Sequence, residues 1–398
     1  MSLRSSGFGF FLAACSAPSA IVPPVDEPSS IVSYLDDPAF RRRELETSLV
    51  NPDNGYSRKR LAMYTEAGWG ALPVWNPPAA PVATAVPSVV DASQLQTLAL
   101  PSRCTEAELL ALGREAFGSY PAQLATYAKS ALDRSDAAAR YGLFDRDGQL
   151  SGLVHVELPG GSTTTALTCS TCHSITDAGR WIPGRANAAF RLDRMTADAV
   201  GGGPDIWGPG RVDVTPDGID NPTAITDLRP VRFQQTLQRA GTVRNDLVKL
   251  AIRIETLLIT NLNESVRPPR EVAMGLALYL RSFSDPLVAP TRESDGARVF
   301  ARECSGCHQG DTLTGPSVAF DRVKTDEGIL LSPDRTTGSV RVPSLRGVAD
   351  RTPLLSSGAF GSLDVMFAQG RQESGHLFGT TLSMDERAAL LVFLRSLR

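Results

Sequence analysis

The pattern C-x-x-C-H occurs twice in this chain of 398 residues, at 169–173 (CSTCH) and at 304–308 (CSGCH). It is the signature of c-type haem attachment. Two thiols three positions apart on a helical turn can each add to one haem vinyl group, and the adjacent histidine then places its Nε2 under the iron. With six Cys and four His in the chain, one chance match is expected roughly once per thousand sequences. We therefore predict two covalently bound haems c, on Cys169, Cys172 and His173 and on Cys304, Cys307 and His308.

Two other uses of paired cysteines fit less well. A zinc ribbon places its pairs about 15–20 residues apart, whereas these pairs lie well over a hundred residues apart. Redox C-x-x-C motifs do not require the histidine. After the second motif, Thr314-Gly315-Pro316 lies where cytochromes c place a Gly-Pro whose carbonyl accepts the histidine Nδ1–H. Such a bond at Pro316 would fix the tautomer of His308.

Composition and charge narrow the class of protein. A net charge of −3 leaves no basic stripe that would neutralise phosphates, so nucleic acid is not an expected partner. The length and the 42% hydrophobic content suffice for two compact domains. The many Gly and Pro residues (34 and 28) predict long loops between modest helices and no large continuous sheet.

The first residues resemble a bacterial export signal. Arg4 precedes an apolar run at 7–14 that is too short to span a bilayer. Residues 12–15 (LAAC) resemble a lipobox, in which cleavage before Cys15 is followed by its lipidation, and Ser16 differs from the Asp that retains such proteins at the inner membrane. We therefore expect a signal peptide at 1–14 and a lipid-anchored, periplasm-facing protein of the cell envelope, at the outer more than the inner membrane. An ordinary signal with an unrelated cysteine is the alternative.

Residues 15–100 predict a lipid-anchored tether or N-terminal extension. Several Pro clusters surround two short amphipathic stretches, near 40–49 and 58–67. Tyr64, Trp69 and Trp75 could dock onto the body of the protein, and a fully disordered spacer is the alternative.

A weak internal repeat divides the rest of the chain. Residues 113–117 (GREAF) match 296–300 (GARVF), and residues 277–283 (ALYLRSF) match 391–397 (LVFLRSL). Each predicted unit, 101–285 and 291–398, thus opens with a helix that carries Gly and Phe four apart, and closes with an apolar helix that can pack across it. Residues 153–168, with Pro-Gly-Gly at 159–161, predict a β-hairpin insertion. The expected fold class is mainly α, with two cytochrome c-like haem domains, long loops and this small hairpin.

Further motifs resemble those of a known family. Residues 342–349 (VPSLRGVA), followed by Thr352-Pro353 and Gly358, resemble the T-P-S-L-R-N-V-A…P-Y…D-G segment of bacterial dihaem cytochrome c peroxidases. Residues 206–211 (IWGPGR) resemble that family's F-W-D-G-R element between the haems, and residues 375–383 are similar to the ending of rubber oxygenases. The resemblance covers roughly 101–398 and places the chain in the wider dihaem peroxidase superfamily.

The resemblance implies roles and also shows departures. Trp207 corresponds to a tryptophan that relays electrons between the haems, with a plain buried anchor as the alternative. The family holds calcium between its haems, and the acidic loop beyond Trp207 carries candidate oxygen ligands, with a solvated turn as the alternative. Those ligands are Asp213, Asp217, Asp220 and Asn221. The family's G-H-x-W histidine is replaced by Gly179-Arg180-Trp181, and Ser356-Ser357 replaces an H-D pair, which weakens the case for a conventional peroxide-cleaving site.

Few residues remain as sixth ligands of the two irons. Once the motif histidines are assigned, His155 and His376 are left, together with methionines. His376 lies in a Gly-flanked loop and is our candidate for the second haem, whereas His155 falls in the predicted hairpin and is more often structural. Among the methionines, Met274 fits a helix core and Met384 an exposed helix start, which leaves Met195 and Met366 as candidates.

These features support two hypotheses on function. In the first, the chain is a peroxidase-like oxidoreductase that acts on peroxide or O₂ at an open first haem, where Arg180 or Arg185 donates hydrogen bonds to the developing negative charge. Electrons would arrive through the second haem from a small redox protein or a quinone-linked donor. In the second, both irons are six-coordinate and the chain only transfers electrons. Cys104 has no evident partner and is expected to be a buried free thiol.

Overall fold

The computed structural model describes residues 27–65, 68–84, 92–146, 148–203, 206–213, 219–284, 289–325, 327–330, 332–372 and 375–397. The expected signal peptide and Cys15 lie outside these residues. Within them the chain forms fifteen α-helices, four 3-10 helices and thirteen β-strands. The fold is therefore mixed and not mainly α as the sequence predicted, because many of the expected long loops pair into short antiparallel ribbons. No helix in these residues has the length and apolar character that a membrane span requires.

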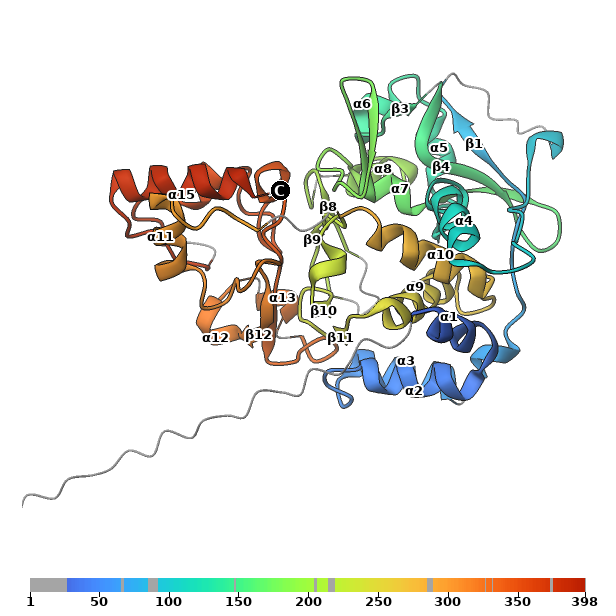
Figure 1. The fold of residues 1–398 in the computed structure, drawn as a ribbon. Coiled ribbons are helices and arrows are strands. Elements are labelled where there is room, and N and C mark those ends of the chain that lie inside the picture. The colour runs from blue at the N-terminus through green and yellow to red at the C-terminus, as the bar shows by residue number, and fades with distance from the viewer. Residues whose placement is uncertain are drawn as a thin grey trace, which may run out of the picture.

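The N-terminal helices pack against the body of the protein (Figure 1). They are α1 (Glu27–Asp36), α2 (Pro38–Ser48) and α3 (Gly55–Thr65), followed by η1 (Trp69–Ala71). The buried carboxylate of Glu255 accepts hydrogen bonds from Tyr34 Oη (2.6 Å) and Trp69 Nε1 (2.5 Å). Tyr64 and Trp75 are buried too, so the predicted docking of these aromatic side chains is confirmed. The described part of 15–100 is a folded layer of the protein.

A five-stranded antiparallel sheet contains the predicted hairpin. Its strands are β1 (Ala79–Ala83), β2 (Gln123–Leu124), β3 (Asp145–Arg146), β4 (Gln149–Glu157) and β5 (Thr163–Leu167), in the order β1-β4-β5-β2 with β3 beside β4. The hairpin is β4 and β5, and Gly160 and Gly161 turn the chain with φ of +109° and +84°. These conformations favour glycine. The sequence missed β1, which joins the sheet from a distant part of the chain.

The remaining elements of the first unit surround its haem-attachment motif. The helices are α4 (Glu106–Ser119), α5 (Ala128–Leu132), α6 (Ala137–Tyr141), α7 (Cys169–His173), α8 (Leu192–Ala199), α9 (Leu247–Asn261) and α10 (Arg270–Arg281), with η2 (Ala92–Gln94) and η3 (Val231–Phe233). Three ribbons pair β6 (Ser174–Asp177) with β7 (Arg180–Pro183), β8 (Arg211–Val212) with β9 (Thr223–Ala224), and β10 (Thr236–Leu237) with β11 (Val243–Arg244).

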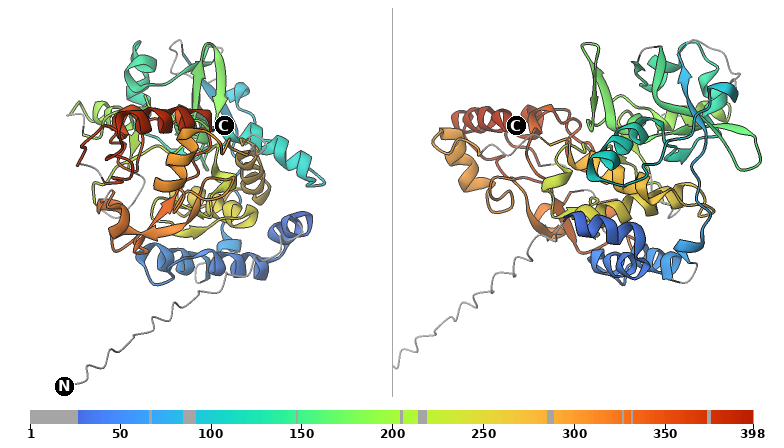
Figure 2. Two further views of the ribbon diagram at one scale, coloured as in Figure 1. Left: turned by 60° about the vertical axis from the view of Figure 1, so that its left-hand side comes forward. Right: turned by 45° about the vertical axis from the view of Figure 1, so that its right-hand side comes forward.

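The second unit is smaller and lies beside the first (Figures 1 and 2). It contains α11 (Asp295–Glu303), α12 (Phe320–Val323), α13 (Glu327–Leu330), η4 (Val348–Asp350), α14 (Leu363–Met366), α15 (Met384–Ser396) and the ribbon of β12 (Gly315–Ala319) with β13 (Ser339–Val342). All residues of its main hydrophobic core come from the range 297–397. The larger hydrophobic clusters of the first unit draw their residues from the range 31–283. One small cluster joins Ala240 of the first unit to Leu330 and Val340 of the second.

The internal repeat corresponds to the same helix crossing in both units. A Cβ atom on Gly113 of α4 would overlap the carbonyl oxygen of Gly275 in α10, and one on Gly296 of α11 would overlap that of Ala389 in α15. The aromatic residues pack in parallel fashion, with Phe117 against Tyr279 (5.5 Å between ring centres) and Phe300 against Phe393 (5.1 Å). Each opening helix thus meets its closing helix backbone to backbone, as the repeat predicted.

Two glycines of α4 allow a matched test of this crossing. Gly113→Ala should lower the free energy of unfolding by about 1–3 kcal/mol, since the added methyl forces the two helices apart. Gly118→Ala is the control, because a Cβ on Gly118 would have no atom within 4 Å, and alanine should stabilise the helix by up to about 1 kcal/mol. Guanidinium unfolding followed by circular dichroism measures both. Equal stability of the two variants would contradict the close crossing.

Candidate functional site

The second C-x-x-C-H motif forms one helical turn directly after α11. The amides of Cys307 and His308 both donate to the carbonyl of Cys304, at 3.1 and 3.0 Å. This turn brings both thiols and the buried imidazole of His308 to one cavity. Ser294 caps the start of α11 by accepting from the amide of Ala297, so the helix that leads into the motif is well defined at both ends.

The acceptor for His308 Nδ1 differs from the sequence prediction. The ring nitrogen lies 3.2 Å from the carbonyl oxygen of Leu313. The sequence predicted an acceptor at Pro316 instead. Leu313 has a φ of +51°, which turns its carbonyl toward the imidazole. Gly315, the residue before Pro316, allows close packing against the motif. A Cβ on Gly315 would overlap the carbonyl oxygen of Cys307. An Nδ1–H donor leaves Nε2 as the nitrogen available to a metal.

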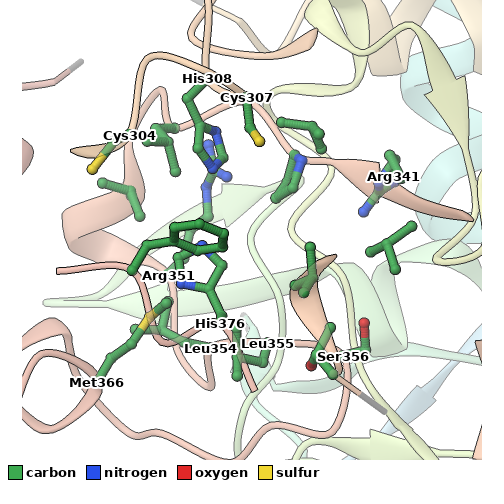
Figure 3. Close-up of a pocket in the computed structure, with 18 of the residues that line it drawn as sticks. Cys304, Cys307, His308, Arg341, Arg351, Leu354, Leu355, Ser356, Met366 and His376 are labelled. Carbon is green, nitrogen blue, oxygen red and sulfur yellow. The ribbon is translucent and has the colours of Figure 1, made fainter. Parts of the chain in front are cut away.

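His376 faces His308 across this cavity, which encloses about 1570 Å³, including space open to solvent (Figure 3). The two ring centres are 6.5 Å apart. Two imidazoles that bind one metal ion through nitrogens at about 2.0–2.1 Å would have ring centres about 6 Å apart. The spacing therefore fits an iron between the two rings.

The loop that carries His376 is held in an uncommon conformation. Gly375 and His376 both have positive φ, +64° and +48°, and a Cβ on Gly375 would overlap the carbonyl oxygen of Lys324. The guanidinium of Arg371 donates to the carbonyls of Gly375 (2.9 Å), His376 (2.8 Å) and Met366 (2.9 Å). Non-glycine residues with positive φ are uncommon and are often found at functional sites. Sequence reasoning missed Arg371, although it lies five residues before the predicted ligand.

The other candidate ligands occupy different environments. Met366 is buried and lines the same cavity. Met274 is fully buried in the core and Met384 is 72% exposed, as expected for each. His155 is half-buried in β4, opposite Thr165 of β5. Cys104 is a half-buried free thiol, and burial raises its pKa.

The first motif, Cys169–His173, is the short helix α7, which packs against β4. Gly152 of that strand, with φ of +83°, approaches so closely that a Cβ would overlap the amide nitrogen of Thr171, and Thr171 Oγ1 donates to the Gly152 carbonyl (2.6 Å). The backbone amide of Asn187 donates to the carbonyl of Cys172 (2.9 Å). His173 Nδ1 lies 2.9 Å from the carbonyl oxygen of Thr226. As at His308, a carbonyl holds Nδ1 and leaves Nε2 available.

Burial keeps both motif histidines and three of the motif cysteines uncharged at neutral pH. It lowers the pKa of both His173 and His308 to about 4, and raises the pKa of Cys169, Cys172 and Cys304 to about 12. Neutral imidazoles can bind a metal, whereas a zinc site requires thiolates. In the described ranges, no three His, Cys, Asp or Glu side chains converge on a metal site.

The predicted oxygen-site arginines and Met195 follow the first motif in the chain. Arg180 is exposed at the start of β7, in the ribbon that follows the motif. Arg185 donates to the backbone carbonyl of Asp350 in the second unit (3.2 Å). Met195 is fully buried in the apolar cluster against which Cys172 packs. Gly184, the residue before Arg185, donates its amide to the His173 carbonyl (2.7 Å), and the roles of Arg180 and Arg185 stay predictions.

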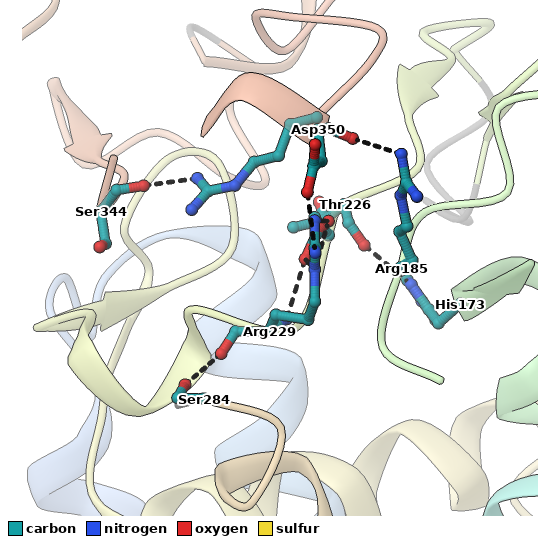
Figure 4. A network of polar contacts seen from close by, with 9 residues as sticks. His173, Arg185, Thr226, Arg229, Ser284, Ser344 and Asp350 are labelled. Atoms are coloured by element: carbon teal, nitrogen blue, oxygen red, sulfur yellow. Dashed lines mark hydrogen bonds and ion pairs between the residues drawn. The ribbon is translucent and has the colours of Figure 1, made fainter. Parts of the chain in front are cut away.

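A polar network that includes His173 of the first motif reaches residues of the second unit (Figure 4). The segment 225–227 lines the cavity of the second motif, while its Thr226 carbonyl accepts from His173 of the first. Asp227 is buried and pairs with Arg229 (2.7 Å), which also lies 3.7 Å from Asp350. One short segment therefore contacts both sites.

Trp207 is half-buried, and its role as an electron relay between the haems stays a prediction. Its indole Nε1 donates to Asp220 Oδ1 (2.6 Å), and its ring packs on the cluster beside Cys172. Arg211 contacts the Trp207 carbonyl and the Gly358 carbonyl of the second unit, each at 3.3 Å.

The acidic loop beyond Trp207 is described only in part. Asp213 accepts from the backbone amide of Asn221 (3.1 Å), and Asp220 accepts the indole N–H of Trp207. Asp217 lies outside the described residues. A calcium ion on these residues stays a prediction.

Comparison with known proteins identifies no family for this chain. No family model and no curated protein matches the chain. Among solved structures, a MauG-like protein associated with microbial copper homeostasis is similar, with a TM-score of 0.30 and 17% identity over 48% of this chain and 79% of that chain.

The geometry predicts His376 as the sixth ligand of a haem on the second motif. In His376→Ala the centre should change from low-spin to high-spin, because one axial nitrogen is lost. Met366→Leu is the matched control, since Met366 lines the same cavity and leucine preserves its volume. Electronic absorption of the oxidised protein measures the change. A low-spin spectrum that survives His376→Ala and is lost in Met366→Leu would transfer the assignment to the methionine.

Proposed function

We propose that this chain is a dihaem c-type cytochrome, a redox protein of the cell envelope. The observation that carries the proposal is the second cavity, where Cys304, Cys307 and His308 come together and His376 lies opposite at a spacing that fits one iron. The first motif repeats the same arrangement of turn, thiols and carbonyl-bound imidazole.

Bound haem iron would supply one-electron redox chemistry. The residues of the chain would set how that iron behaves. Leu313 and Thr226 fix the orientation and tautomer of the two proximal imidazoles through their carbonyls. Arg371 holds the His376 loop in place.

The first haem site is our candidate for oxygen chemistry, as in a peroxidase-like oxidoreductase that acts on peroxide or O₂. The family's distal histidine is replaced by Arg180-Trp181, and an arginine can donate hydrogen bonds to negative charge that develops on a substrate oxygen. Electrons would enter at the second haem from a small redox protein or a quinone-linked donor. They would cross the junction near Trp207 and the Thr226 segment.

One observation favours a second candidate function, electron transfer alone. Met195 is fully buried in the cluster against which Cys172 packs. A thioether at this position is a suitable haem ligand. If Met195 occupied the sixth position, the first iron would be closed to peroxide and O₂.

The number of haems tests the proposal directly. The mature protein should exceed its polypeptide mass by two haems, and its alkaline pyridine spectrum should show the thioether form. The double variant Cys169→Ala/Cys172→Ala should retain one haem, and so should Cys304→Ala/Cys307→Ala, because each motif attaches its own. Cys104→Ala is the control and should keep both. Haem that is removed from the wild type by acid acetone would refute covalent attachment.

Exogenous ligands separate the two candidate functions. With an open first site, the oxidised protein should bind cyanide or azide within minutes, and the reduced protein should bind carbon monoxide. With Met195 as a ligand, the resting spectrum should be wholly low-spin and only Met195→Ala should bind these molecules. Leu192→Ala, which opens the same cluster without removing a candidate ligand, is the control for loosened packing.

We also propose that Cys15 anchors the chain to the membrane by lipid. The proposal rests on the lipobox-like residues 12–15. Labelled palmitate should enter the wild-type protein and be absent from Cys15→Ser. An intact Met1 on a soluble mature form would contradict the anchor.

A further inference from the structure

The second cavity is lined by more arginines than carboxylates. The four arginines are Arg239, Arg322, Arg341 and Arg351. The two carboxylates are Asp227 and Glu303, and each already pairs with an arginine elsewhere, Asp227 with Arg229 and Glu303 with Arg302. The rest of the lining is largely apolar. A bound molecule with a large apolar body and negatively charged groups would pack against the apolar lining and compensate the positive charge of the arginines.

Arg341 is the least compensated of the four. It is 8% exposed, and its guanidinium donates through Nη1 to Gln234 Oε1 (2.7 Å), while its buried Nε has no hydrogen-bond partner. Its charged neighbours are Arg239 and Arg351, and burial together with these two cations lowers its pKa to about 9. Among the ion pairs of the described residues, none includes Arg341. A buried cation without an anion is costly.

Arg351 lies at the edge of the cavity that borders the first unit, and its charged neighbours include the carboxylates Asp227 and Asp350. Its Nη1 donates to the carbonyl of Ser344 (2.5 Å), while its buried Nε and Nη2 have no hydrogen-bond partner. Arg239, from the first unit, donates to the carbonyl of Ala224 (2.7 Å) and lines the same cavity. Three guanidinium groups from two units thus surround one region.

We infer that Arg341, together with Arg239 and Arg351, binds the carboxylates of the haem held by Cys304 and Cys307. The inference rests on the proposed function and extends it to the orientation of the haem. In haem, the two vinyl groups and the two carboxylates lie on opposite sides of the ring. Figure 3 shows Cys304 on one side of His308, and Cys307 and Arg341 on the other. A thioether bond at Cys304 would therefore direct a carboxylate of the opposite ring edge toward the side on which Arg341 lies. Charge-assisted bonds between guanidinium and carboxylate then satisfy the N–H groups of Arg341 and Arg351 that lack partners.

The test uses the full-length protein and three variants. Arg341→Met removes the charge and the donors at similar volume, Arg341→Lys keeps the charge with a single donor group, and Arg298→Met is the control on the exposed face of α11. Haem content is measured first. The readouts are the propionate bending mode in the resonance Raman spectrum and the reduction potential of the second centre.

In Arg341→Met we expect the bending mode to shift to lower frequency and the potential to become more negative, because a nearby positive charge disfavours ferric iron. Arg341→Lys should retain most of the potential but not the bending mode, and Arg298→Met should change neither. If Arg341→Met does not fold, a shifted bending mode in Arg341→Lys supports the inference and an unshifted mode contradicts it.

Each failure has a distinct signature. A wild type without a second haem would overturn the proposed function. Two haems with unchanged mode and potential in the Arg341 variants would overturn only this inference. A wild-type potential that depends on added phosphate, with an unchanged mode in the variants, would assign the arginines to a free anion and would also overturn it.

Discussion

The close crossing of the first and last helices in each unit supports the rest of the structure. At Gly113 and at Gly296 the absence of a side chain lets two backbones touch, and aromatic residues one turn further along pack against each other. In the second unit the motif follows α11 immediately, so the crossing also places the cysteines and His308. In the first unit α7 is reached through the sheet, and Gly152 of β4 supplies the close contact instead. A helix crossing in the second unit and a contact with a strand in the first thus position the same helical turn.

Local sequence patterns predicted those parts of the structure that depend on short segments of the chain. The two motif turns, the β4–β5 hairpin and the pairing of the repeated helices follow from spacing and periodicity within a few residues. The carbonyl partners of the imidazoles did not follow, because Thr226 lies 53 residues from His173 and no pattern marks it. The acceptor of His308 was expected at Pro316 and is Leu313, since a positive φ at one residue redirects a carbonyl. Strand β1 was missed because its partner is some seventy positions away.

Electrostatics was the least predictable part of the candidate site. An arginine in a sequence gives no sign of whether it will be buried, and Arg341 lies in a strand of alternating valines that could equally face solvent. Only the fold shows that Arg239, Arg341 and Arg351 meet around one cavity, since they come from separate elements of two units. By contrast, His376 could be singled out because few histidines were available and glycine precedes it.

The wall that the first unit contributes to the second cavity limits how this architecture can be recombined. Ile225, Gln234 and Arg239 belong to the first unit but line the cavity of the second motif. A gene fragment that encoded residues 291–398 alone would lack these residues, and the apolar lining would open to water. The complete lining of the second cavity therefore requires both units, and exchange of one half between related proteins would have to preserve the segment 225–239 as well.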